Sequence, residues 1–319
     1  MFREVLDSYP EFAEKTYEEF KNSYLKQTFK EIVFCGMGGS SSPALILKPF
    51  FEKREIKVKI CQNYKIPNIS LKNSLIVVIS YSGNTLETIK CLNEALKRKL
   101  KTVVISSNGK IIEIAKKFKV KYFEIEKNLL PRLAIPIFLV LILSILRKSL
   151  RISKKRVKEI IKILRITRNR RKFARRVARR IKGTIPLIYS FPEFYGVAYR
   201  FKTQINENAK IHAFVAKLPE AAHNEIAAFE DRNSQLFSII FLGTPSNNFE
   251  RKIMNSFEFT VMNKVVNVVR IEEHGKNLLE KLVYLTYFCD YVSYFLAILK
   301  GINPSSTPLI DSYKKKLKK

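Results

Sequence analysis

Residues 75 to 85 read Leu75-Ile76-Val77-Val78-Ile79-Ser80-Tyr81-Ser82-Gly83-Asn84-Thr85. The apolar, largely β-branched first half predicts a buried strand, and the hydroxyl-rich second half predicts a turn that opens a helix. A helix start offers free backbone N–H groups and the positive end of the helix dipole. Three hydroxyls and a glycine at such a junction predict a cradle for a phosphoryl group.

The rest of the chain repeats this strand-then-helix pattern. In the first half, strands are expected at 32–35, 57–60, 75–79, 102–105 and 121–123, and helices at 44–53, 85–100 and 111–118. In the second half, strands are expected at 185–189, 212–215, 236–242 and 265–269, and helices from Phe194, Asn247, Gly275 and Thr307 onward. Strict alternation predicts parallel sheets covered by helices on both faces. We therefore expect an α/β chain of two doubly wound domains, 1–150 and 151–319, with ligands at the carboxyl edge of the strands.

The charge of the chain is strongly positive and unevenly distributed. Its 319 residues carry a formal net charge of +31, and the segment 147–182 alone holds 18 basic residues and one acidic residue. Apolar residues recur there at helical spacing, at Val157, Ile160, Ile161 and Leu164, so the charges are expected to coat an amphipathic helix. Phe173 is the single aromatic residue among them, so there is no pattern of aromatic interleaving, and no groove-reading motif accompanies them. We therefore do not expect nucleic acid to be a partner.

The spacing of the cysteines and the hydropathy of the chain indicate in which cellular compartment the protein is expected. Cys35, Cys61, Cys91 and Cys289 form no C-x-x-C pair and have no histidine at ligand spacing, which argues against zinc and against a disulfide framework. The N-terminus lacks a signal-peptide pattern. The apolar stretch 133–146 is shorter than a bilayer span and predicts a buried helix. These features indicate a reduced cytoplasm and no membrane association.

A second glycine-rich loop, Gly36-Met37-Gly38-Gly39-Ser40, follows the first expected strand. It lacks the third glycine of a dinucleotide fingerprint, and no acidic residue ends the second strand, so nicotinamide binding is disfavoured. Exposed backbone N–H groups against a sugar hydroxyl or phosphate fit the loop better, although a plain tight turn explains it equally well.

Glu207 and His223 are the residues best suited to acid–base chemistry. A single carboxylate is able to move a proton between two neighbouring carbons, and imidazole suits ring opening near neutral pH. Taken alone, Glu207 is also compatible with a solvated helix position between Asn206 and Asn208, and His223 with a helix cap or a buried histidine.

The motifs together resemble the sugar isomerase (SIS) domain of the phosphoglucose isomerase superfamily, and more closely the archaeal-type bifunctional phosphoglucose/phosphomannose isomerases. The resemblance spans nearly the whole chain in family order. It is carried by Gly36–Ser40, Ser80–Thr88, Pro131-Arg132, Lys202–Lys210 and His223-Asn224-Glu225. Residues 41–44, Ser-Ser-Pro-Ala, depart from the small apolar residues and further glycine usual in the family, which bears on substrate choice.

The resemblance implies specific roles. Glu207 matches the proton-shuttling base, and His223 the ring-opening residue that this superfamily shares across a dimer interface. Arg132 matches the positive group near the enediolate oxygens, and Lys314 the C-terminal active-site lysine, with Lys315 and Lys316 as neighbouring registers. The substrate-binding residues implied are Gly39, Ser40, Ser80, Ser82, Thr85 and Thr307, of which Ser80, Ser82 and Thr85 hold the phosphate.

The expected function is a homodimeric, cytoplasmic isomerase that converts glucose 6-phosphate and mannose 6-phosphate to fructose 6-phosphate through a cis-enediol. The resemblance implies no metal and no cofactor, and a sugar phosphate as the small-molecule partner. The alternative of another class is a non-catalytic phosphosugar sensor, associated with nucleic acid through the basic helix. An amino-sugar or arabinose phosphate isomerase is a third possibility, against which the two-half layout argues.

Overall fold

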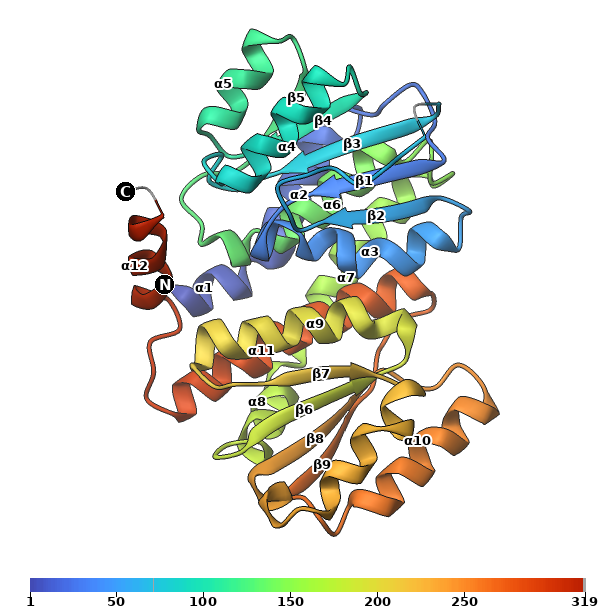
Figure 1. Ribbon diagram of the computed structural model, residues 1–319, viewed down its shortest axis with the longest axis vertical. Helices are drawn as coiled ribbons and strands as arrows, with labels where there is room; N and C mark the ends of the chain where they lie inside the picture. Colours follow the sequence, from blue (N-terminus) through green and yellow to red (C-terminus); the bar gives the residue numbers. More distant parts are fainter. Residues whose placement is uncertain (71, 318–319) are drawn as a thin grey trace. The chain divides into compact units, whose positions relative to one another are not determined.

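The computed structural model describes residues 1–70 and 72–317 (Figure 1). Contacts between Cα atoms divide the chain into two compact units. The N-terminal unit comprises 7–165 with 276–280, and the C-terminal unit comprises 1–6, 166–275 and 281–319. The predicted division into 1–150 and 151–319 stays a prediction, because the contact-defined units change at 165 and 166 and each includes a segment from elsewhere in the chain.

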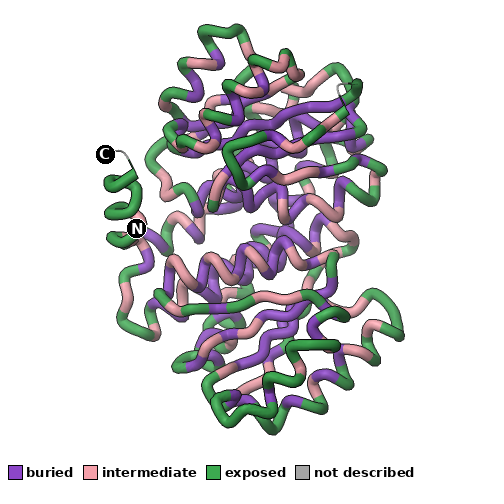
Figure 2. Tube along the Cα trace, in the orientation of Figure 1, coloured by how far each residue is buried: buried purple, intermediate pink, exposed green. Residues whose placement is uncertain are grey.

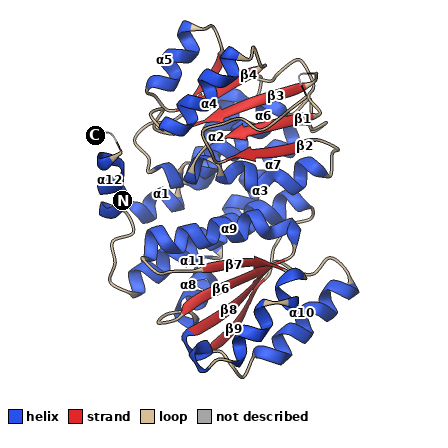
Figure 3. Ribbon diagram, in the orientation of Figure 1, coloured by secondary structure: helices blue, strands red, loops and turns tan. Residues whose placement is uncertain are grey.

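The N-terminal unit is built on a five-stranded sheet of order β2-β1-β3-β4-β5 (Figure 3). All of its pairings are parallel. The strands β1 and β3 lie inside the sheet and every one of their residues is buried, which explains the apolar runs Ile32–Cys35 and Leu75–Ile79. The bounds are β1 Glu31–Cys35, β2 Lys57–Cys61, β3 Ser74–Ile79, β4 Thr102–Ser106 and β5 Lys121–Glu124.

Helices cover this sheet. One core cluster joins α4 and α5 to the sheet through residues such as Val33, Ile76, Leu92 and Ile112. On α6 all twelve residues are buried (Figure 2), as predicted for the apolar stretch at 133–146. The helices are α2 Tyr9–Phe20, α3 Ser42–Glu52, α4 Leu86–Lys97, α5 Lys110–Lys117, α6 Ile135–Leu146 and α7 Lys154–Asn169, the last of which continues into the other unit.

The C-terminal unit contains a four-stranded parallel sheet of order β7-β6-β8-β9. Its core packs α10 against the sheet through Tyr189, Ile239, Phe241, Met254 and Phe257. The strands are β6 Ile185–Ser190, β7 Phe214–Lys217, β8 Phe237–Leu242 and β9 Asn267–Ile271. The helices are α1 Phe2–Asp7, α8 Arg171–Arg180, α9 Tyr195–Gln204, α10 Asn248–Val261, α11 Leu278–Leu299 and α12 Pro308–Lys316, with the first three residues of α11 in the other unit.

Within residues 1–70 and 72–317, one helix, α11, is long and apolar enough to cross a membrane, but 78% of its most apolar 18-residue stretch is buried. It also carries Asp290, which pairs with Arg200 of α9 at 2.7 Å, and both side chains are 1% exposed. A buried ion pair to a neighbouring helix is typical of a core helix. The protein interior therefore accounts for the apolar character of α11.

The predicted fold class is confirmed, with two α/β units on parallel sheets. All nine predicted strands are present, although β7 and β9 begin two residues later than expected. The basic segment forms two helices, α7 and α8, instead of one continuous helix. The predicted apolar face is confirmed, because Val157, Ile160, Ile161 and Leu164 are all buried.

Candidate active site

The loop after β3 forms the predicted strand-to-helix junction. Ser80 is buried, and its hydroxyl donates to Thr85 Oγ1 at 3.1 Å. Thr85 is the N-cap of α4 and makes no side-chain cap hydrogen bond. Ser82 is exposed, and its Oγ accepts from the Asn84 N–H at 3.4 Å. The structure therefore brings the three predicted phosphate-binding hydroxyls to the amino end of one helix.

The loop after β1 lies against this junction. Its Ser40 is buried, and the Ser40 Oγ accepts from the Tyr81 N–H at 3.1 Å. Gly39 leaves room for the chain at Arg132, because a Cβ at Gly39 would lie 3.2 Å from the Arg132 Cα. Arg132 itself is 5% exposed, on the short 3₁₀ turn Pro131–Leu133. Gly39, Ser40 and Arg132 thus belong with the phosphate-loop residues at the carboxyl edge of the first sheet.

Close backbone contact fixes the shape of the 80–85 loop. Gly83 has φ +68°, and a Cβ there would lie 1.7 Å from the Asn108 carbonyl oxygen. Two serines at the end of β4 also fix the loop. Ser106 donates to the Ser80 carbonyl oxygen at 2.5 Å, and Ser107 donates to the Tyr81 carbonyl oxygen at 2.6 Å. Only glycine fits at position 83, so the cradle is preformed.

Glu207 lies on a π-helical turn, Ile205–Ala209, that continues α9. The asparagines beside it are tied to the scaffold: Asn206 Nδ2 donates to the Ile211 carbonyl oxygen at 2.7 Å, and Asn208 Nδ2 donates to Ser293 Oγ at 3.0 Å. Single-turn π segments are frequent at functional sites, and Glu207 lies on such a turn with its side chain half-buried.

His223 is exposed, at the end of the 3₁₀ turn Glu220–His223. Glu207 precedes β7 and His223 follows it, so they flank opposite ends of that strand, which alone spans roughly 10 Å. The structure does not bring these two residues together within one chain. Near His223, Glu225 accepts from the Tyr189 hydroxyl at 3.0 Å, and burial, with the nearby Glu225 charge, raises the pKa of that phenol.

Lys314 lies on α12, on which no residue is buried, and Thr307 directly precedes that helix. Thr307 is the N-cap and Pro308 the first residue of the helix, as the sequence predicts. Lys314 is exposed. Leu309 and Tyr313, one helical turn apart, are 85% and 62% exposed, so one side of α12 presents apolar groups to solvent.

Two features of the site escape sequence reasoning. The Thr88 hydroxyl, in the first turn of α4, is buried and has no hydrogen-bond partner within the described ranges 1–70 and 72–317. Thr88 ends the Ser80–Thr88 block that carries the family resemblance, and that position was the one sequence feature that could have indicated it. The π turn has no such signal, because Ile-Asn-Glu-Asn-Ala is compatible with an ordinary helix end.

Comparison with protein families and known proteins identifies related domains, folds and sequences. Residues 27–116 match the SIS domain, and residues 170–317 match the bacterial phospho-glucose isomerase C-terminal SIS domain. The fold is similar to that of a hypothetical protein from Thermus thermophilus, with a TM-score of 0.79, 14% identity, and coverage of 98% of this chain and 89% of that one. At that identity the likeness concerns the fold alone.

Curated relatives extend over most of the sequence. A bifunctional phosphoglucose/phosphomannose isomerase of Aquifex aeolicus is 32% identical over 91% of both chains, and one of Thermoplasma acidophilum is 31% identical over 93% of both. A D-glucosamine-6-phosphate 4-epimerase of Sulfolobus acidocaldarius is 31% identical over 70% of this chain and 71% of its own. The predicted family resemblance is thereby confirmed over nine-tenths of the sequence, and the chain belongs to the family of bifunctional phosphoglucose/phosphomannose isomerases.

Proposed function

We propose that this protein interconverts glucose 6-phosphate and mannose 6-phosphate with fructose 6-phosphate. The observation that carries the proposal is similarity over nearly the whole chain to relatives named for that activity. Seven such relatives are bifunctional phosphoglucose/phosphomannose isomerases. The preformed cradle of Ser80, Ser82 and Thr85 at the start of α4 supports a phosphosugar substrate.

The proposed chemistry follows from the acid–base properties of the side chains. The Glu207 carboxylate removes the proton from C2 of the open-chain sugar, which gives a cis-enediolate, and returns it to C1. Transfer of the O2 hydroxyl proton to O1 passes through the cis-enediol and leaves the ketose carbonyl at C2. Glucose and mannose 6-phosphates differ only in configuration at C2, which proton loss erases, so both enter through the same enediol. The Arg132 guanidinium stabilises negative charge on the enediolate oxygens. Thr307, the N-cap of α12, binds the substrate, and Lys314 on α12 is the C-terminal lysine of the active site.

A coupled assay with Glu207→Gln tests the proposal. Wild-type protein is expected to produce fructose 6-phosphate from each substrate. Glu207→Gln is expected to lower kcat on the order of 10³-fold, because the amide cannot accept the proton. Phosphosugar binding, measured directly by calorimetry, is expected to stay within about twofold, because the phosphate loop lies elsewhere in the chain.

Glu230→Gln is the matched control, since Glu230 is an exposed glutamate of the same unit outside the proposed site, and it should retain wild-type turnover. Full activity in Glu207→Gln would refute the assigned base. Binding of glucose 6-phosphate by the wild type without turnover would favour the phosphosugar sensor. Turnover of an amino sugar phosphate at C4 alone would place the chain with the epimerase relative.

We also propose a cytoplasmic homodimer in which His223 of one protomer opens the sugar ring in its partner's site. All four cysteines are free and buried, which fits a reducing compartment. The separation of Glu207 and His223 along β7 and the exposure of His223 support sharing between protomers. The exposed Leu309 and Tyr313 of α12 supply apolar surface suited to a second copy.

Subunit complementation tests the sharing of His223. Glu207→Gln and His223→Ala are each expected to be inactive as homodimers. When the two chains are co-expressed, a mixed dimer would pair the intact Glu207 of one chain with the intact His223 of the other. Random mixing should then restore about one quarter of the sites. No recovery in an isolated mixed dimer would show that His223 acts within its own chain.

A further inference from the structure

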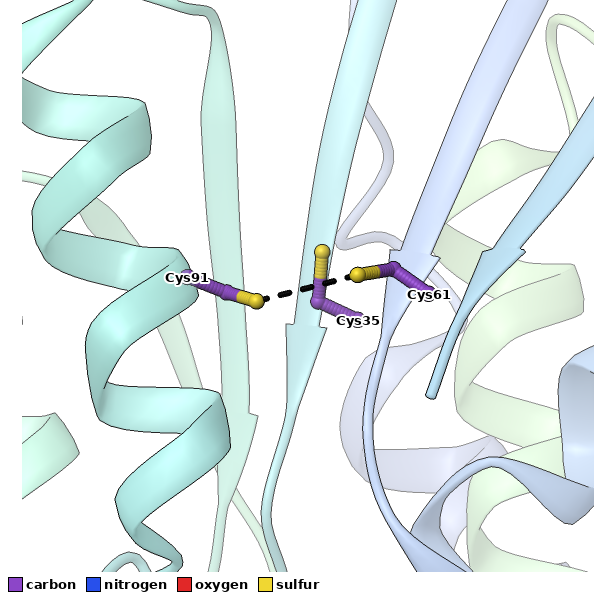
Figure 4. Close-up of side chains that lie close together, drawn as sticks. All are labelled: Cys35, Cys61 and Cys91. Carbon is purple, nitrogen blue, oxygen red and sulfur yellow. Dashed lines mark hydrogen bonds between the residues drawn. The ribbon is translucent and has the colours of Figure 1, made fainter. Parts of the chain in front are cut away.

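Three buried cysteines of the N-terminal unit converge on one point. Cys35 ends β1, Cys61 ends β2 and Cys91 lies within α4 (Figure 4). The parallel register pairs Cys35 with Cys61, so both side chains lie on the sheet face that α4 covers. The three Sγ atoms all lie within 4.8 Å of one another, and none of the three residues is more than 5% exposed.

Main-chain oxygens complete the surroundings of these thiols. The Asn63 carbonyl oxygen accepts from Cys91 Sγ at 3.2 Å and from Cys61 Sγ at 3.6 Å. The Lys65 carbonyl oxygen accepts from Cys61 Sγ at 3.1 Å. Three sulfur atoms therefore lie close together, and the Asn63 carbonyl oxygen contacts two of them.

The spacing of the sulfurs suits a tetrahedral cation. Cys61 Sγ and Cys91 Sγ lie 3.8 Å apart. A tetrahedral zinc site with Zn–S bonds of about 2.3 Å places its sulfurs about 3.8 Å apart. A disulfide would require about 2.05 Å. Cys61 and Cys91 thus stand at the separation of two ligands around a metal ion, and Cys35 Sγ lies within 4.8 Å of both.

The chemistry of the donors selects the metal. Sulfur ligands exclude magnesium and calcium, which take oxygen ligands. Three thiolates bound to a divalent ion leave a net charge of −1, whereas three thiolates bound to Cu(I) leave −2. Because buried charge is costly, the divalent ion is favoured. We propose that Cys35, Cys61 and Cys91 bind a structural zinc ion, with the Asn63 carbonyl oxygen as fourth ligand.

The position of this site gives it a structural consequence. Cys35 directly precedes the Gly36–Ser40 loop, and the Gly36 N–H donates to the Cys61 carbonyl oxygen at 3.2 Å. Cys91 lies on the helix whose first turn forms the phosphate cradle. The ion would join both substrate loops through their supporting elements without touching substrate. Metal removal should therefore lower thermal stability, because the bound ion stabilises only the folded state.

Metal content of tag-free protein tests the proposal. Protein refolded with zinc and then desalted is expected to hold about one zinc ion per chain. Cys61→Ala and Cys91→Ala, checked for folding by circular dichroism, should each retain less than about a tenth of that amount. Cys289→Ala is the matched control, because Cys289 is a free buried cysteine on α11, and it should keep the full amount.

Spectroscopy of the wild type provides a second test that needs no variant. Cobalt(II) refolded into the protein should show intense sulfur-to-metal charge-transfer absorption and the visible bands of a tetrahedral ion. X-ray absorption of the zinc form should give three sulfur neighbours at about 2.3 Å and one oxygen at about 2.0 to 2.2 Å.

Three outcomes would overturn the zinc site. They are no zinc uptake on refolding, full zinc retention in both Cys61→Ala and Cys91→Ala, and a coordination shell of nitrogen and oxygen alone. In each case the three thiols would be packed core side chains only. These readouts are independent of isomerase activity, so they stand apart from the test of the proposed function.

Discussion

Glu31 is a buried carboxylate whose ionisation is coupled to stability. It lies 2.8 Å from Lys59 Nζ and accepts from the Ser70 N–H and the Ser74 hydroxyl at 3.0 and 3.1 Å. Burial alone would raise its pKa, but the Lys59 ammonium and the two hydrogen bonds outweigh burial and hold the pKa below its usual value. A depressed folded-state pKa gives stability that is present above the unfolded value of about 4.3.

We therefore expect the free energy of unfolding to fall as pH drops below about 4.3 and through the folded-state pKa of Glu31. Urea unfolding between neutral and acidic pH measures this. Glu31→Gln should lower stability at neutral pH and flatten the acid limb. Glu113→Gln, at an exposed position on α5, should leave the profile unchanged. Parallel profiles for wild type and Glu31→Gln would contradict the coupling.

Single residues also show how far sequence reasoning reaches. The positions of Ser40, Ser80 and Thr85 were predictable, because hydroxyls directly after parallel strands must meet at one edge of the sheet. The cysteine cluster was not, because Cys35, Cys61 and Cys91 are 26 and 30 residues apart, and only the register of β1 with β2 and the packing of α4 on the sheet bring them together. Spacing rules detect ligands that share a local segment, and these three do not.

At the level of elements, the 80–85 loop depends on close backbone approach. Gly83→Ala would combine a strained φ with a Cβ 1.7 Å from the Asn108 oxygen. We expect it to lower the free energy of unfolding by about 3 kcal/mol and to raise the KM for sugar phosphates, because the loop must move. Thermal or urea unfolding and steady-state kinetics measure the two effects.

Gly38→Ala is the matched control for this prediction. Gly38 also has positive φ, +53°, but its Cβ would have no atom within 4 Å. Gly38→Ala should lower the free energy of unfolding only by the backbone strain of a positive φ, about 1 kcal/mol. Equal destabilisation by the two variants would mean that the contact with Asn108 contributes nothing.

Element boundaries reveal where pattern reasoning stops. Strands with unbroken apolar runs, such as Leu75–Ile79, were predictable because a central parallel strand is buried on both faces. The start of β7 was predicted two residues early, since the chain leaves the π turn through Lys210 in the left-handed conformation and reaches the sheet only at Phe214. That irregular turn is held by a local hydrogen bond of Asn206 to Ile211 and a tertiary one of Asn208 to Ser293.

For the molecule as a whole, the net charge of +31 bears on encounter with anionic substrates. On α8 the exposed positions are predominantly arginine, while Ala174 and Ala178 face inward. We expect kcat/KM for glucose 6-phosphate to fall roughly tenfold from low to high ionic strength as the field is screened, with kcat unchanged.

Steady-state kinetics across a salt series measures this effect. A triple variant, Arg175→Gln with Arg176→Gln and Arg179→Gln, should lower kcat/KM at low salt only. A flat salt dependence in the wild type would show that the charge has no part in substrate capture. Nucleic acid that stays bound at low salt and is released at high salt would instead assign the α8 face to a polyanion.

The π turn at Ile205–Ala209 has an evolutionary consequence. A π turn arises from an α-helix by insertion of a single residue, and each residue along a helix rotates the next side chain by about 100°. The direction of the carboxylate at position 207 thus depends on the number of residues in the preceding helix as much as on the residue type. Loss of one codon upstream in α9 would restore a regular helix and turn Glu207 to another face while every motif residue remained. Within this lineage, a gap of one position in an otherwise intact motif would therefore mark a change of chemistry.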